Sequence, residues 1–166
     1  MQGTQKYANQ FKVKNVPLAL FTDADGDEVH RATFFDDKSL SRAMEAAAQK
    51  YADQPVPWKT EFRAEPNSKK LLVVGFNDEK EEGLKALEDR SLVKFRDRLV
   101  FLKQPYEKNG AAVNTWKVIQ APSVVLADAS KENPEKDPLE RMSGKKTPMA
   151  FKVAIQKALR KLDSAK

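Results

Sequence analysis

The chain has 166 residues, of which 33% are charged and 40% are hydrophobic, and its net charge is +6. A length near 150 residues suits one domain or two very small ones. The sequence holds no cysteine and one histidine, His30, which excludes disulfides and thiol redox chemistry by residues of this chain. No stretch approaches the roughly 18 apolar residues of a membrane span, and the start, MQGTQKYANQ, shows no secretory signal. We therefore expect a soluble chain without a membrane partner, a metal or a cofactor, and its compartment is unknown.

The charge is unevenly distributed along the chain. Residues 1–65 hold 9 Lys and Arg against 10 Asp and Glu, whereas residues 66–166 hold 21 against 14. Such an asymmetry is typical of proteins with an acidic or nucleic-acid partner. Because acidic residues are interspersed among most of the basic ones, the pattern favours a solvated surface.

The first third of the chain predicts a helix, a hairpin and a second helix. The predicted elements are a helix over 2–12, strands over 16–22 and 29–35, and a helix over 37–52. Asp25 and Gly26 lie between the two strands and are typical of a tight hairpin turn, because both residue types accept a positive φ. Asp36 and Asp37 precede apolar residues at helical spacing and suit the start of the second helix.

The rest of the chain predicts a linker followed by strands and helices. The predicted elements are a linker over 55–68 with a short strand at 58–62, strands over 70–76, 98–102, 123–127 and 139–142, helices over 78–97 and 147–162, and a loop or short helix over 105–115. The run KLLVVGF at 70–76 is apolar on both faces, which predicts a strand buried on both sides.

Two stretches of the chain are similar to each other. They read FKVKNVPLALFTD at 11–23 and WKVIQAPSVVLAD at 116–128, at an offset of 105 positions. Both contain an aromatic residue, Lys-Val, a small apolar residue before proline, an apolar strand and a final Asp. The second copy alone is preceded by strand, helix and strand, over 70–102. This repeat predicts half of a structural unit followed by a complete one.

The complete copy, with its β-α-β pattern and its Val-x-x-Ala-Pro before a hairpin and a helix, resembles the thioredoxin fold. The first copy, KYANQFKVKNVPLALFTDADGDEV, is similar to the C-terminal half of a thioredoxin-like domain. The resemblance implies an α/β fold, a thioredoxin-like mixed sheet flanked by helices, with an additional N-terminal half-unit of helix, hairpin and helix. The implied domains are the half-unit over 1–54, the linker over 55–68 and the complete domain over 69–166.

The resemblance also implies a sheet order and a peptide-binding site. Strand 70–76 is expected near the centre of the sheet, between strand 98–102 and the hairpin that begins at Ser123. Cis peptide bonds are implied at Val16–Pro17 and at Ala121–Pro122, where the residue before the proline offers its backbone to an extended peptide.

The chain departs from the family at the redox motif. The Cys-x-x-Cys pair of the family opens the helix after the first strand, and this chain has no sulfur at that place. The residues there are Asn77, Asp78, Glu79 and Lys80. In the first copy the segment that would carry the pair is absent, so either the natural domain starts upstream or another chain completes the fold.

A cluster of aspartates in the predicted hairpin turn invites a functional interpretation and is better explained by structure. Asp23, Asp25 and Asp27 alternate as in an EF-hand loop, but positions 6 and 12 of such a loop are Glu28 and Phe34. We therefore expect a hairpin turn and no calcium site.

His30 would need a positioned partner to act as a general base, and none is predicted. We therefore expect His30 to be a solvent-facing residue of its strand. The acidic run 78–82 suits a helix start, where carboxylates are stabilised by free N–H groups. The last helix carries Lys152, Lys157, Arg160 and Lys161, and its apolar face has the content of a helix that packs on a core.

Three functions from different classes stay open. The first is a redox-inactive thioredoxin-like module, structural or binding, that holds an extended protein or peptide beside Pro122. The second is the C-terminal portion of a thiol-disulfide oxidoreductase whose cysteines lie upstream of this chain. The third is a basic nucleic-acid-binding protein, which is not favoured because no run interleaves aromatic with basic residues. A homodimer through the half-unit is also predicted, because strand 17–22 would leave an uncovered edge.

Overall fold

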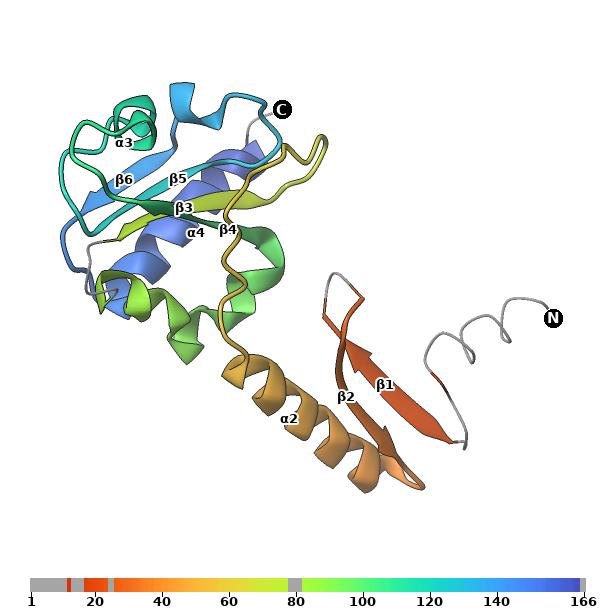
Figure 1. Cartoon of the computed structure of the whole chain (residues 1–166). Coiled ribbons are helices and arrows are strands. Elements are labelled where there is room, and N and C mark those ends of the chain that lie inside the picture. Colours follow the sequence, from red (N-terminus) through yellow and green to blue (C-terminus); the bar gives the residue numbers. More distant parts are fainter. Residues whose placement is uncertain (1–11, 13–16, 24–25, 78–81, 165–166) are drawn as a thin grey trace. The chain divides into compact units, whose positions relative to one another are not determined.

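The computed structural model describes residues 12, 17–23, 26–77 and 82–164, and the chain divides into two units, Met1–Gln54 (unit 1) and Pro55–Lys166 (unit 2) (Figure 1). Unit 1 contains an antiparallel hairpin, in which β1 (Leu18–Thr22) pairs with β2 (Glu28–Thr33), followed by helix α2 (Asp37–Asp53). The predicted hairpin and second helix are thus confirmed. A helix-hairpin-helix half-unit is not shown, because the predicted helix over 2–12 lies outside the described residues apart from Lys12.

The turn and the helix start of unit 1 follow from local chemistry. Gly26 has φ +90°, a conformation that glycine adopts without steric cost. Helix α2 begins with a capping box, in which the Asp36 carboxylate accepts from the Ser39 N–H and the Ser39 hydroxyl accepts from the Asp36 N–H. Ala43 and Ala47 are the buried residues of α2, so the described part of unit 1 has a small core.

Unit 2 is built on a mixed four-stranded sheet with the order β4–β3–β5–β6. Its elements are β3 (Leu71–Asn77), η1 (Glu82–Glu88), η2 (Arg90–Arg98), β4 (Leu99–Pro105), α3 (Ala111–Trp116), β5 (Ser123–Asp128), η3 (Pro134–Lys136), β6 (Glu140–Ser143) and α4 (Pro148–Ser164). Strand β3 runs parallel to β4 and antiparallel to β5, and β6 is antiparallel to β5. The predicted central place of strand 70–76 is therefore confirmed.

Alternating side chains of β3 divide the core of unit 2 into two layers. Leu71 and Val73 point to the face covered by η1, η2 and α4, whereas Leu72, Val74 and Phe76 point to the face covered by α3. Figure 1 shows α4 crossing one face of the sheet. All seven residues of β3 are buried, as expected for a strand that is apolar on both faces.

The prediction of a single α-helix over 78–97 is wrong, because the described part of the segment forms helices of another type. The described part consists of two 3₁₀ helices, η1 and η2, separated at Asp89, whose backbone is extended and whose carboxylate accepts from the Ser91 N–H. The buried leucines Leu84 and Leu87 are three residues apart, which matches the three residues per turn of a 3₁₀ helix. The extended backbone of Asp89, whose side chain caps η2, explains why no continuous helix runs through the segment.

Residues 55–68 pack on the sheet of unit 2. The short strand predicted at 58–62 is reduced to a single parallel bridge between Lys59 and Leu102. Val56 is buried, and the Trp58 ring stands edge-on to Phe101, with 5.3 Å between the ring centroids. This segment therefore covers β4 and contributes to the core.

An ion pair connects the end of α4 to Arg98, the last residue of η2. The Arg98 guanidinium donates two hydrogen bonds to the Asp163 carboxylate, the shorter at 2.7 Å, and a third to the Lys69 carbonyl. The hydrogen bond from Arg98 lowers the pKa of Asp163 below its ordinary value of 3.8. Among the described residues, none of the helices has the length and apolar content needed to cross a bilayer.

The buried face of α4 should dominate its contribution to stability. We expect Ile155→Ala to lower the free energy of unfolding by about 3 kcal/mol, because Ile155 is fully buried and the change leaves a cavity. Val153→Ala, on the exposed side of the same helix, should change it by less than about 0.5 kcal/mol. Urea denaturation of both variants measures this difference, and equal effects would contradict the assigned orientation of α4.

The Arg98–Asp163 pair should lose its stabilising effect in acid. Because the pKa of Asp163 is lowered in the folded chain, the contribution is present above the ordinary pKa of 3.8 and disappears as the pH falls through the folded value. Arg98→Gln should return the pKa of Asp163 toward 3.8, as read from the carboxyl carbon shift in an NMR titration. An unchanged pKa in the variant would show that Arg98 is not the cause.

Candidate functional site at the loop before β5

The Ala121–Pro122 peptide bond is cis, as the resemblance implied for this position. Pro122 is buried and Ala121 is partly exposed, immediately before β5. Of the corresponding pair in unit 1, Pro17 is exposed and Val16 lies outside the described residues, so the cis bond predicted at Val16–Pro17 stays a prediction. The structure thus provides one described cis-proline loop, and that loop belongs to unit 2.

Gly83 of η1 packs directly on the ring of Pro122. A Cβ atom added to Gly83 would lie 2.2 Å from the Pro122 Cβ and 2.5 Å from its Cγ, so a residue with a side chain does not fit without movement. The contact at Gly75 is similarly close, because a Cβ there would lie 2.6 Å from Leu84 Cδ1 and 3.0 Å from the Trp58 ring. These two glycines let η1 lie tightly against both the sheet and the cis proline.

Hydrogen bonds hold the loop on both sides of Ala121. The Tyr106 hydroxyl donates to the Ile119 carbonyl at 3.0 Å, and the Ser123 hydroxyl donates to the Gln120 carbonyl at 2.6 Å. The Gly144 N–H donates to the Pro122 carbonyl at 2.7 Å. The loop is therefore fixed by the residue after β4, the first residue of β5 and the residue after β6.

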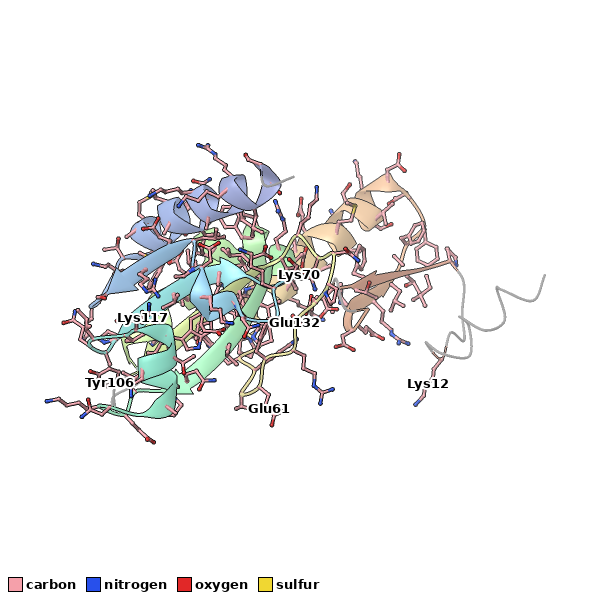
Figure 2. All side chains as sticks on the ribbon, turned by 90° about the horizontal axis from the view of Figure 1, so that it is seen from above. Lys12, Glu61, Lys70, Tyr106, Lys117 and Glu132 are labelled. Carbon is pink, nitrogen blue, oxygen red and sulfur yellow. The ribbon has the colours of Figure 1, made fainter. Side chains whose placement is uncertain are left out.

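The loop begins where α3 ends. Lys117 has a left-handed backbone with φ 52°, and its N–H bonds back to carbonyls of the helix. Figure 2 shows the labelled Tyr106 and Lys117 near α3. This end of the helix therefore directs the chain into the loop that leads to Ala121.

Ala121 differs from its neighbours in the loop in the hydrogen bonding of its backbone. Within the described residues, its N–H and its carbonyl have no hydrogen-bond partner, although the carbonyls at positions 119, 120 and 122 are all engaged. The neighbouring Ile119 side chain is 82% exposed. A backbone N–H and C=O without partners on a partly exposed residue can pair with an extended chain, as strands do at a sheet edge.

Asn77 ends β3 beside this loop, since the preceding residue, Phe76, pairs with Ser123. Its side chain is buried, and its Oδ1 has no hydrogen-bond partner among the described residues. The other residues of the sulfur-free motif position, Asp78, Glu79 and Lys80, lie outside the described residues. The structure therefore brings Asn77 and Pro122 to the same end of the sheet, with Gly83 against the proline.

Sequence reasoning missed Gly83, Tyr106 and Gly144 as parts of this site. A signal existed for Gly83, because a glycine inside a predicted helix marks a close approach of the backbone. Tyr106 and Gly144 follow from tertiary contacts 13 and 22 residues away from their partners, Ile119 and Pro122, and no local pattern reveals them.

The other candidates have local structural roles. The Asp23 carboxylate accepts from the Asp27 N–H at 2.8 Å and so closes the hairpin turn. His30 is partly buried, stacks on Phe21 at 6.0 Å between ring centroids, and its Nδ1 lies 3.0 Å from the Lys50 ammonium nitrogen. No group of three His, Asp or Glu side chains in the described part of the chain is arranged to hold a metal ion.

The comparisons with known proteins concern the fold. No family model and no curated protein matches the chain. It is similar to a thioredoxin from Trypanosoma brucei brucei, at 15% identity and TM-score 0.44, covering 65% of this chain and 96% of that one. It is also similar to a thioredoxin from Thermus thermophilus, at 16% identity and TM-score 0.41, covering 62% of this chain and 88% of that one. A third similar structure is a DsbH oxidoreductase, at 16% identity and TM-score 0.37, covering 64% of this chain and 90% of that one.

At these identities and TM-scores the likeness is loose. The thioredoxin-like topology of unit 2 rests on its strand order β4–β3–β5–β6, with β4 parallel to β3 and with an antiparallel hairpin of β5 and β6. Unit 2 therefore has a thioredoxin-like fold in a chain without cysteine, and no thiol of this chain can carry redox chemistry.

The contact between Gly83 and Pro122 should tolerate no added methyl group. We expect Gly83→Ala to lower the free energy of unfolding by about 1 to 3 kcal/mol, since the methyl carbon would overlap the proline ring. Lys85→Ala, at an exposed position of η1, should stay within about 0.5 kcal/mol of the unmodified chain. Thermal and urea denaturation measure both, and a neutral Gly83→Ala would contradict the close packing.

Proposed function

We propose that unit 2 is a redox-inactive thioredoxin-like binding module that holds an extended segment of a partner protein against Ala121. The observation that carries the proposal is that neither backbone group of Ala121 has a partner in the described part of the chain, whereas the carbonyls of residues 119, 120 and 122 are engaged. An extended segment would accept from the Ala121 N–H and donate to its carbonyl.

The surroundings of Ala121 support this interpretation. Pro122 is buried under Gly83, and three hydrogen bonds fix the neighbouring carbonyls, so ordering the loop on binding costs little entropy. Ile119 offers an exposed apolar side chain beside the backbone groups, which favours a partner segment with an apolar residue there. The absence of cysteine from the sequence favours binding without thiol exchange.

The proposal is tested by selecting binders from a displayed library of random short peptides. In the full chain labelled with nitrogen-15, a selected peptide should shift the Ala121 amide resonance and slow its hydrogen exchange. Ala121→Pro removes the N–H donor and should weaken binding about tenfold, whereas Ala121→Ser keeps the donor and should bind like the unmodified chain.

If Ala121→Pro does not fold, the hydrogen exchange of the Ala121 amide in the unmodified chain still tests the proposal. Peptides that perturb other surfaces and leave the amide of Ala121 unchanged would overturn the proposal. The same holds for a folded Ala121→Pro variant with full affinity.

A further inference from the structure

The positive charge of the chain is concentrated in its last 26 residues. Residues 141–166 hold eight Lys and Arg against a single Asp, and the remaining 140 residues hold 22 Lys and Arg against 23 Asp and Glu. The C-terminal segment thus carries +7 and the rest of the chain carries −1. This segment comprises most of β6, helix α4 and their connection, and four of its eight basic residues, Lys152, Lys157, Arg160 and Lys161, belong to α4.

Helix α4 has two different faces. Its inner face is fully part of the core and consists of Phe151, Ala154, Ile155, Ala158 and Leu159. Its outer face bears two exposed apolar side chains one turn apart, Met149 (62% exposed) and Val153 (57% exposed). The outer face therefore has an apolar patch that the fold of unit 2 does not use.

Basic side chains lie beside this apolar patch and follow it along the helix. A groove of about 410 Å³ runs along the helix and is lined by Val153, Gln156, Lys157, Arg160, Lys161 and Ser164. Lys152 precedes Val153 and is partly exposed. From Met149 to Arg160 the surface extends for about 17 Å, three turns of helix.

Two of these cationic side chains have a partner within the chain, and two have no carboxylate partner among the described residues. Lys157 pairs with Glu140 at 2.9 Å, and the Lys161 ammonium donates to the Leu139 carbonyl. Within the described residues, the side chains of Lys152 and Arg160 have no carboxylate partner. The surface therefore keeps unneutralised charge next to exposed apolar side chains.

We propose that this outer face of α4, from Met149 to Arg160, is a docking surface for a segment of a partner protein that combines acidic with apolar residues. Charge complementarity selects the acidic residues, which would pair with Lys152 and Arg160. The apolar residues of the partner would cover Met149 and Val153 and remove their side chains from water. The surface is separate from the loop at Ala121 and does not depend on the function proposed for it.

The same features argue against other anionic partners. A nucleic-acid backbone would pair with the lysines but would leave Met149 and Val153 uncovered, and no aromatic side chain on the described outer face of α4 is available for base stacking. An amphipathic helix that lies on a membrane needs a broad apolar face. The broad apolar face of α4 is buried in the core, which favours a protein partner.

The test uses two labelled synthetic peptides with identical acidic content and helical design. One carries leucine pairs four residues apart, and in the other these leucines are glutamine. Fluorescence anisotropy with the full chain at low salt should give about tenfold tighter binding for the leucine peptide. Met149→Gln with Val153→Ser should abolish this difference, while the affinity for the glutamine peptide stays unchanged.

Charge reversal provides the matched control. Lys152→Glu with Arg160→Glu should weaken binding of both peptides by about tenfold or more. Arg63→Glu with Lys108→Glu changes the net charge by the same amount away from α4 and should have a much smaller effect. All variants are first shown to unfold at the same urea concentration as the unmodified chain, since every changed residue is at least partly exposed.

Several results would overturn the proposal. One is the absence of binding by both peptides at low salt, and another is an equal loss of affinity in the control double variant. Tighter binding of random-sequence DNA or RNA, or of vesicles containing phosphatidylserine, with loss on Lys152→Glu and Arg160→Glu, would assign the surface to another class of partner. Equal affinities of the two peptides for the unmodified chain would show that Met149 and Val153 take no part.

Discussion

The structure of unit 2 depends on one strand that is buried along its whole length. Strand β3 pairs with β4 on one edge and β5 on the other, and its side chains alternate between two apolar layers. A strand in this position cannot shift by one residue, because a shift would exchange the residues of the two layers. The register of β3 against β5 therefore fixes Ser123 opposite Phe76. This pairing places the cis proline next to the end of β3, where Gly83 covers it.

Much of this arrangement could be predicted from the sequence, because it is encoded locally. The apolar run of β3 predicts a central strand, and the stretch WKVIQAPSVVLAD predicts a proline immediately before a buried strand.

The predictions that failed also have physical causes. The segment after β3 predicts one α-helix, but the structure has two 3₁₀ helices, because the backbone is extended at Asp89 and the Asp89 side chain caps the second helix. The bonds that hold the loop around Ala121 come from Tyr106 and Gly144, which no local pattern connects to it.

Unit 1 has a different balance of forces. Two strands and one helix bury few side chains in the described residues, mainly Ala43 and Ala47, while Phe35 and Met44 are exposed. An isolated two-stranded hairpin is marginally stable in water, so unit 1 gains little from its own core. Strand β1 pairs with β2 alone within the described residues. The homodimer through this unit stays a prediction, and its physical basis is the edge of β1 that no described strand covers.

Helix α4 links the stability of unit 2 to its charge. Its inner face fills the core, where any polar substitution would be costly, so the sequence is free to vary only on the outer side. On that side the chain places lysine and arginine almost without acids, although a surface designed for solubility alone would mix both signs. The rest of the chain carries a net charge of −1, so the segment 141–166 accounts for the net positive charge of the chain. The docking surface proposed on α4 would attract an acidic partner through these charges.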